Sequence, residues 1–266
     1  MSIFGFESAK LAAFCRSEEQ LFLTTLLKKN TLDEAWAFLN AQSCALNRRN
    51  AHGLPLQFVP QSCLPEGQAY ESFIAQTGQV PTRPNAHDAL NAMMWFAWPQ
   101  SKAALNCRQA AEIVRLGSTQ TRGAWRDKMT LMDENGAIVV LPETAEAQAW
   151  HKLWQAHDWV AALWVHRAYC QNQLQLHFFG HALLEKLLAP YKGITAHCWV
   201  VFAPDSYFCA SPCAQKQWLD AHLAEQFFDA AALPVYLPLP VLGWPRVGVP
   251  VDMAYYQDTL VFRPKR

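Results

Sequence analysis

Long apolar runs are missing from this chain of 266 residues. A helix needs about 20 consecutive apolar residues to cross a bilayer, and the longest candidates are much shorter: 92–99, 159–165 and the proline-interrupted 233–245. Residues 1–20 also lack the basic stretch followed by an apolar one that is typical of a signal peptide. We therefore expect a soluble, cytoplasmic protein with no membrane span.

An excess of charge of either sign is missing too, because 22 Lys and Arg residues balance 22 Asp and Glu residues. Proteins that bind nucleic acid usually carry excess positive charge, which neutralises the phosphates. The composition therefore gives no strong nucleic-acid signal. A net charge near zero weakens the repulsion between copies, so self-association is possible. Nothing in the sequence indicates a particular partner or cofactor.

Several motifs of known chemistry are absent. None of the eight cysteines forms a CxxC pair, which argues against zinc ribbons and thioredoxin-like sites. No glycine-rich strand–turn–helix and no GxSxG segment is present, so a P-loop, a dinucleotide fingerprint and a nucleophile elbow are excluded. We expect the cysteines to be mostly buried thiols that act as small apolar residues.

What the chain does contain is a large apolar core and many helix signals. It is 52% hydrophobic, with 11 Trp and 15 Phe residues, which is typical of a folded protein. Thr31 and Glu34 have the spacing of a capping box at a helix start. Asn85 can cap a further helix that runs to about Trp98, where Pro99 stops it.

Signals for strands are fewer and shorter. The Asn135-Gly136 step between apolar runs predicts a β-hairpin near residues 128–141, and residues 194–202 are typical of a buried strand. A helix is expected from about residue 67 to about 76, closed by Gly78. We predict an α+β fold that is mostly helical with short strands. A single domain would cover residues 1–266, with a helical N-terminal segment (about 1–50) packed on it.

The densest group of polar residues lies at the start of the helix that follows Asn85. His87 and Asn91 are four residues apart, and Asp88 and Asn91 are three apart, so these side chains share one helical face. In a structural interpretation, Asn85 caps the helix and Asp88 complements its dipole. In a functional one, His87 is a general base or metal ligand that Asp88 or Asn91 orients.

Two further groups could bind ligands. Arg122 and Arg126 could form an anion site, although a solvated turn with surface ion pairs is the simpler interpretation. His181 and Glu185 are four residues apart on an expected helix, and His197 on a strand-like segment could be a third metal ligand. A His–Glu hydrogen bond without any metal would explain the same pattern.

These groups lie within sequence blocks that resemble a known family. The blocks are GQVPTR (78–83), N-x-HD-x-x-NA-x-x-W (85–95), P-x-x-K-x-x-LN (99–106), RD (126–127), TL-x-DENG (130–136), GHALLEKLL with PY (180–191) and FRP (262–264). Together they resemble the bacterial domain-of-unknown-function family 3025. Ala86 and Ala89-Leu90 depart from it, because bulkier apolar residues are expected there. The resemblance implies that the polar groups converge in space, but it implies no reaction, cofactor or partner.

Two hypotheses follow for the function. The first is a binding or scaffold protein whose polar residues form a structural network. The alternative is a hydrolase, metal-dependent or not, acting on phosphodiester or nucleotide substrates. In that enzyme His87, Asp88 and Asn91 would form the site, Arg126 would bind an anion, and His181 would assist. The first hypothesis is favoured, because no complete catalytic motif is present.

Overall fold

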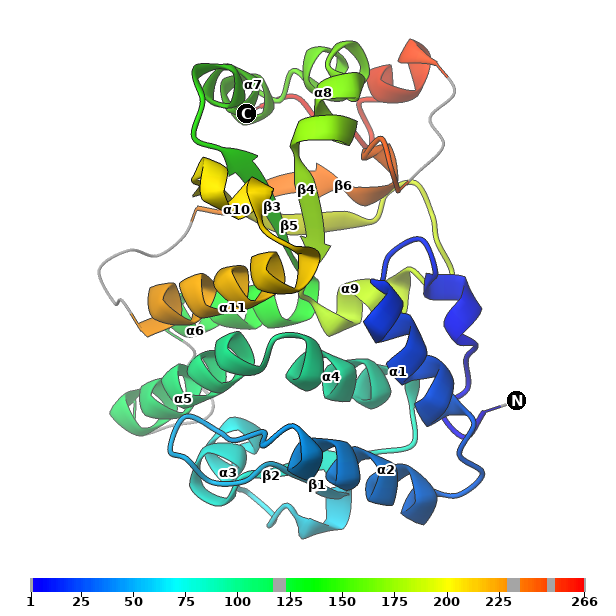
Figure 1. Ribbon diagram of the computed structural model, residues 1–266, viewed down its shortest axis with the longest axis vertical. Coiled ribbons are helices and arrows are strands. Elements are labelled where there is room, and N and C mark those ends of the chain that lie inside the picture. Colours follow the sequence, from blue (N-terminus) through cyan, green and yellow to red (C-terminus); the bar gives the residue numbers. More distant parts are fainter. Residues whose placement is uncertain (1, 117–122, 229–234, 248–251, 266) are drawn as a thin grey trace. The chain divides into compact units, whose positions relative to one another are not determined.

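A computed structural model describes residues 2–116, 123–228, 235–247 and 252–265 (Figure 1). The chain divides into two compact units. Unit 1 comprises Met1–Leu131 and Lys216–Leu233, and unit 2 comprises Met132–Gln215 and Pro234–Arg266. The expected helical N-terminal segment is thus part of unit 1. That the whole chain acts as one domain stays a prediction.

Unit 1 is mainly helical, with one small parallel sheet. Strand β1 (Gln57–Pro60) pairs in parallel with β2 (Gln79–Thr82). The helices of the unit are η1 (Ser8–Leu11), α1 (Ser17–Leu27), α2 (Leu32–Ala45), η2 (Gln61–Cys63), α3 (Tyr70–Thr77), α4 (Ala86–Ala97), α5 (Pro99–Leu116), most of α6 (Ala124–Asn135) and most of α11 (Pro212–Phe228).

The capping residues predicted from the sequence begin two of these helices. The Thr31 hydroxyl accepts a hydrogen bond from the backbone N–H of Glu34 at 3.2 Å. The Glu34 carboxylate accepts one from the N–H of Asn30, a residue earlier than a standard capping box. At α4, the Asn85 side chain accepts a hydrogen bond from the N–H of Asp88 at 2.8 Å. Pro99 ends this helix as expected, but it also serves as the first residue of α5.

Unit 2 contains a four-stranded mixed sheet with the order β4-β3-β5-β6. Strand β3 (Gly136–Pro142) is parallel to β5 (Thr195–Ala203), whereas β4 (Gln175–Phe178) and β6 (Leu237–Pro240) are antiparallel to their neighbours. The helices are α7 (Ala145–Gln155), the π-helix η3 (Val160–Val165), α8 (Arg167–Gln173), α9 (His181–Lys186), α10 (Asp205–Cys209), η4 (Val241–Gly243) and η5 (Met253–Gln257).

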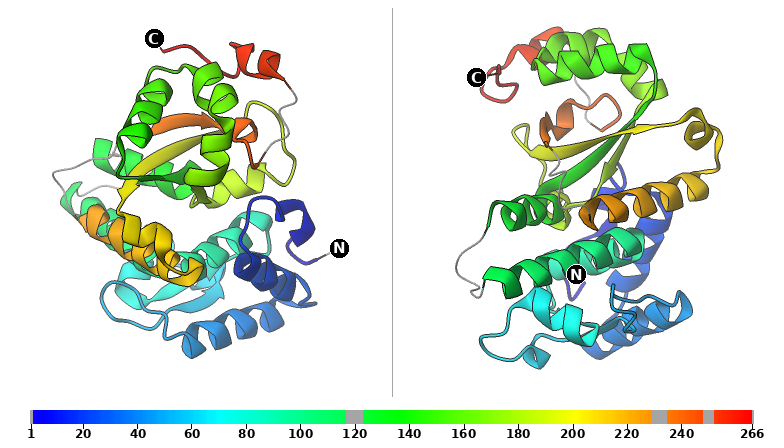
Figure 2. Two further views of the ribbon diagram at one scale, coloured as in Figure 1. Left: turned by 45° about the horizontal axis from the view of Figure 1, so that its top comes forward. Right: turned by 90° about the vertical axis from the view of Figure 1, so that its left-hand side faces the viewer.

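Helices α7 and α8 cover one face of this sheet (Figure 2). Buried Trp side chains fix α7 in place, since the indole N–H of Trp150 donates to the Ala162 carbonyl and that of Trp154 donates to the Pro238 carbonyl on β6. A large aromatic side chain buries much apolar area, and its polar N–H needs a partner when it is buried. The two hydrogen bonds give the indole N–H groups their partners, and the buried rings contribute the apolar area.

The predicted fold class is confirmed: the protein is α+β and mostly helical. The β-hairpin predicted near residues 128–141 is wrong. Residues 124–135 form α6, and Gly136 starts β3, which pairs with β4 and β5 rather than with the preceding residues. The Asn135-Gly136 signal has another cause here, because a Cβ on Gly136 would collide with the Met132 carbonyl of the helix that ends beside it.

The expectation of mostly buried cysteines is also wrong. All eight are free thiols, and only Cys170 and Cys198 are buried. Four are exposed: Cys44, Cys63, Cys209 and Cys213. Separately, no helix in the described parts of the chain combines the length and apolarity that a membrane crossing needs.

Gly78 ends α3 in a left-handed conformation, with φ of 72°, and a Cβ at this position would meet the Pro55 carbonyl. We expect Gly78→Ala to lower the free energy of unfolding by roughly 3 kcal/mol, because a clash adds to a backbone strain of about 1–2 kcal/mol. Urea denaturation gives this value. Gly53 is the matched control: its φ is 79°, but nothing lies within 4 Å of an added Cβ. Gly53→Ala should therefore lower the free energy of unfolding only by the backbone strain. Equal losses for the two variants would contradict the predicted clash.

Candidate functional site

At the start of α4, the Asp88 side chain is hydrogen-bonded to Arg83. Both carboxylate oxygens of Asp88 accept from Arg83: Oδ2 from its backbone N–H at 2.7 Å and its Nε at 3.0 Å, and Oδ1 from Nη2 at 2.9 Å. The same contacts raise the pKa of Arg83 above its ordinary value. Asp88 is buried, with 8% of its surface exposed, so this pairing joins the chain before the helix to its first turn.

Asn91, one turn further along α4, is held from both sides. Its Oδ1 accepts from the Lys102 amine of α5 at 3.0 Å, and its amide donates to the Tyr70 hydroxyl of α3 at 3.1 Å. The Lys102 amine also lies over the Trp95 ring, which compensates part of the cost of burying a cation. Asn91 therefore links three helices of unit 1.

The other candidates of unit 1 are less enclosed. His87 is half-buried on α4. Arg126 lies near the start of α6, and its Nη1 is buried without a hydrogen-bond partner among the described residues. Arg122 lies outside the described residues. The roles proposed for His87, Asp88, Asn91 and Arg126 in a reaction stay predictions.

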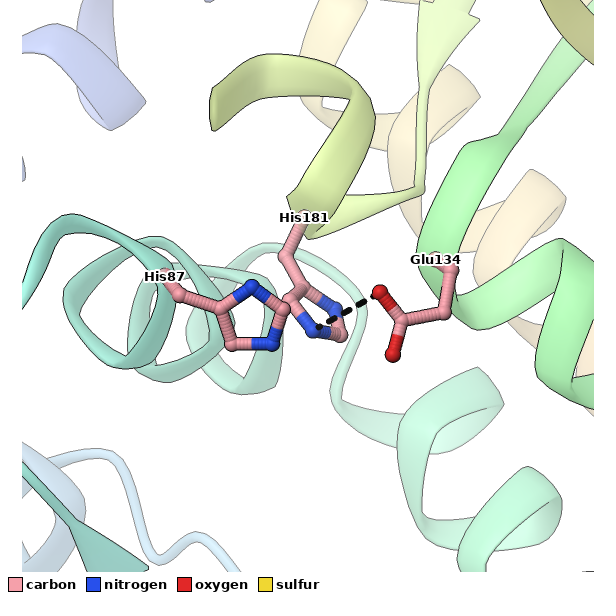
Figure 3. Close-up of side chains that lie close together, drawn as sticks. All are labelled: His87, Glu134 and His181. Carbon is pink, nitrogen blue, oxygen red and sulfur yellow. Dashed lines mark ion pairs between the residues drawn. The ribbon is translucent and has the colours of Figure 1, made fainter. Parts of the chain in front are cut away.

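In unit 2, two of the sequence blocks come together. Gly180 packs directly on the end of α6: its N–H donates to the Gly136 carbonyl at 2.8 Å, and a Cβ there would lie 2.5 Å from the Glu134 carbonyl oxygen. This close approach places the next residue, His181, beside the Glu134 carboxylate, with 3.7 Å between Nε2 and Oε2 (Figure 3). Lys186, at the end of α9, donates to the Asn135 side chain at 2.6 Å.

In the His181–Glu134 pair, the imidazole is buried and the carboxylate is partly exposed to solvent. The His181 side chain is 4% exposed and that of Glu134 is 36% exposed. A carboxylate beside an imidazole orients the ring. Such a pair can move a proton or provide ligands for a metal ion.

The sequence-predicted metal set of unit 2 included two other residues. His181 lies beside Glu134, and Glu185, the predicted partner, is half-buried four residues along the same helix. His197 lies opposite Gly136 in the β3–β5 pairing. Burial and the nearby Lys186 amine lower the pKa of His197, which leaves a neutral imidazole near neutral pH. Metal binding by His181, Glu185 and His197 stays a prediction.

Unit 1 also buries a group of charges that sequence patterns do not reveal. The Lys216 amine lies over the Trp98 ring, 3.8 Å from a carboxylate oxygen of Glu19. Burial lowers the pKa of Lys216 to about 7; Glu19 and Asp220 oppose this shift, and Arg16 adds to it. The side chain is 17% exposed, but its Nζ is shielded from solvent.

An apolar cavity of about 430 Å³ opens between α1, α2 and α4 of unit 1. This volume falls within the range of small-molecule sites. The cavity wall is largely apolar, with Phe22, Phe38 and Phe96 among its residues and Arg48 as its one basic residue.

The comparisons with known proteins place the chain in a family. Residues 56–266 match the family described as "Protein of unknown function (DUF3025)". The chain belongs to the DUF3025 family. Neither the curated proteins nor the solved structures yielded a match. The α4 and α9 groups of this DUF3025 protein lie inside the matched range, whereas α1 and α2, which form much of the cavity wall, precede it.

Sequence reasoning missed several residues of these groups. Lys216 and Arg48 stand in none of the sequence blocks, and Lys102 lies in the block 99–106, which does not reveal its contact with Asn91. Glu134 lies within residues 128–141, for which the sequence predicted a hairpin. Its pairing with His181 depends on the close approach that Gly180 permits, which no local pattern reveals.

The buried Lys216 amine predicts an unusual dependence of stability on pH. Its folded-state pKa of about 7 lies below the ordinary value of 10.5, so the unfolded chain binds more protons between these limits. The free energy of unfolding should therefore rise between about pH 7 and about pH 10, by on the order of 1 kcal/mol per pH unit at most.

Urea denaturation of wild type and Lys216→Met across this pH range tests the prediction. The variant should be the more stable protein at neutral pH and should lose the rise. Lys152→Met, at an exposed position on α7, is the matched control and should keep it. Parallel pH curves for wild type and Lys216→Met would contradict a depressed pKa.

Proposed function

We propose that this DUF3025 protein is a binding protein in which the polar residues of α4 form a structural network. The observation that carries the proposal is the pairing of Asp88, whose two oxygens accept three hydrogen bonds from Arg83. Charge-assisted hydrogen bonds of this kind are stronger than neutral ones, so they bind the chain before α4 firmly to its first turn. We further propose that the protein works in the cytoplasm.

The contacts of Asn91 support the same proposal. Its side chain bonds to α3 through Tyr70 and to α5 through Lys102, so its polar atoms serve the packing of helices. Buried networks whose members are all satisfied rigidify a core. The network would hold α4 steady as one wall of the apolar cavity, where Met93 and Phe96 lie.

A structural network should be costly to remove. We expect Asp88→Ala to lower the free energy of unfolding by about 2 kcal/mol, because the bonds to a charged group are lost, although the largely exposed Arg83 guanidinium recovers water contacts. Thermal and urea unfolding measure the loss. Asp127→Ala, at an exposed acidic position in the first turn of α6, should change the free energy by much less.

The two hypotheses differ in what these variants do. A hydrolase with its site on α4 predicts that His87→Ala and Asp88→Ala fold as stably as wild type while phosphodiester or nucleotide hydrolysis disappears. Wild-type stability in Asp88→Ala would therefore refute the structural network, whatever activity is found.

The His181–Glu134 pair of unit 2 favours a second candidate, a metal-dependent hydrolase. Two sequence blocks meet at this pair, and an imidazole beside a partly exposed carboxylate is a common start of a metal site. In this proposal His181 and Glu134 bind a divalent cation and water completes its coordination. The cation would activate that water for attack on a phosphodiester.

Metal analysis of protein purified without an affinity tag tests the second candidate. A near-stoichiometric divalent metal should be present in wild type and lost in His181→Ala and Glu134→Gln while both variants stay folded. Glu146→Gln, at an exposed position on α7 that was not a candidate ligand, is the matched control and should keep the metal. His87→Ala in the same assay tests the ligand role predicted from the sequence. No metal in wild type, with both histidine variants destabilised, would make these side chains structural.

A further inference from the structure

The wall of the apolar cavity in unit 1 is suited to binding a ligand. Its rings lie close together, with centroids 5.5 Å apart for Phe22 and Phe38 and 4.8 Å apart for Phe22 and Phe96. Two leucines at the cavity are largely exposed, Leu21 at 69% and Leu46 at 49%. Exposed apolar side chains around a hollow favour the binding of a hydrocarbon, since its burial also removes their area from water.

One residue of the wall carries an uncompensated charge. Arg48 donates from Nη2 to the Phe96 carbonyl at 3.2 Å, but its Nε is buried without a hydrogen-bond partner, and no carboxylate among the described residues forms an ion pair with it. Burial lowers the pKa of Arg48, and the charge of Asp220 offsets this only in part. A guanidinium in this position lacks a counter-ion.

Two acidic residues around Arg48, Asp220 and Glu19, have other partners. Asp220 accepts from the backbone N–H groups of Gln100 and Ser101. Glu19, in the cavity wall, accepts from the backbone N–H of Arg16 and lies beside the Lys216 amine. A bound anion would therefore supply what the chain itself does not.

We propose that the cavity binds an apolar monocarboxylate, with the carboxylate on Arg48 and the hydrocarbon among the phenylalanine rings; this rests on the proposed binding function. A carboxylate matches the planar guanidinium and can accept two hydrogen bonds from it. Glu18 and Glu19 in the same wall favour a monoanion over a phosphate, because they repel a doubly charged anion more strongly than a singly charged one. Alkyl and aryl carboxylates share the required chemistry.

The test compares decanoate with decanol, which have the same chain and differ in charge, by calorimetric titration of the full-length protein. Wild type should bind decanoate at least about tenfold more tightly than decanol. Arg48→Met should weaken decanoate at least about tenfold and leave decanol unchanged. Arg49→Met, which removes the same charge one residue away and outside this cavity, should bind like wild type.

A filled cavity provides the second arm. Thr25 lines the wall, so Thr25→Trp should weaken both ligands, whereas Asn30→Trp, at an exposed position outside the cavity, should weaken neither. Equal affinity of wild type for acid and alcohol would overturn the carboxylate assignment, and so would binding that Thr25→Trp leaves intact. A dimer that Leu21→Glu dissociates would assign the cavity to a second copy of the chain and likewise overturn it.

This outcome is separable from that of the proposed function. Asp88 does not line the cavity, so the stability of Asp88→Ala reports on the network alone. If decanoate does not bind but Asp88→Ala is destabilised, the proposed ligand class is wrong and the proposed structural network is retained.

Discussion

Unit 1 depends on a single buried carboxylate, that of Asp220. It accepts hydrogen bonds from the N–H groups of Gln100 and Ser101, and the Ser101 hydroxyl donates back to the Asp220 carbonyl. The first N–H groups of a helix have no partner within the helix, so α5 obtains its cap from a helix more than a hundred residues later in the chain. Because that cap is buried, α11 must return to α5, and unit 1 consists of two stretches of chain with most of unit 2 between them.

The same contact explains why the neighbouring charges are unusual. With both oxygens bound to backbone N–H groups, Asp220 attracts Arg48 and Lys216 without neutralising either of them. Burial is the dominant effect on the pKa of each of these cations, and it lowers both values. Arg48 thus has no ion-pair partner among the described residues, because the nearby Asp220 carboxylate caps α5.

Contacts between residues close in sequence could be predicted, and contacts between distant residues could not. Thr31, Asn85 and Gly78 act within a few residues of themselves, and each does what its residue type favours. The Asn135-Gly136 pair has the same local chemistry but a different result, because its neighbours are set by Gly180 and by the strand β5. A turn signal describes the conformations a dipeptide tolerates, and packing decides which of them is used.

For the candidate sites, the residue types were visible but their partners were not. Asp88 and Asn91 were found from helical spacing, yet the contacts that define them come from Arg83, Tyr70 and Lys102. These contacts separate two kinds of polar residue. One whose hydrogen-bonding capacity is fully used within the fold holds the fold together, and a substrate gains little by competing for it. Arg48 retains a buried Nε without a hydrogen-bond partner among the described residues, so binding is more readily expected there than at Asp88 and Asn91.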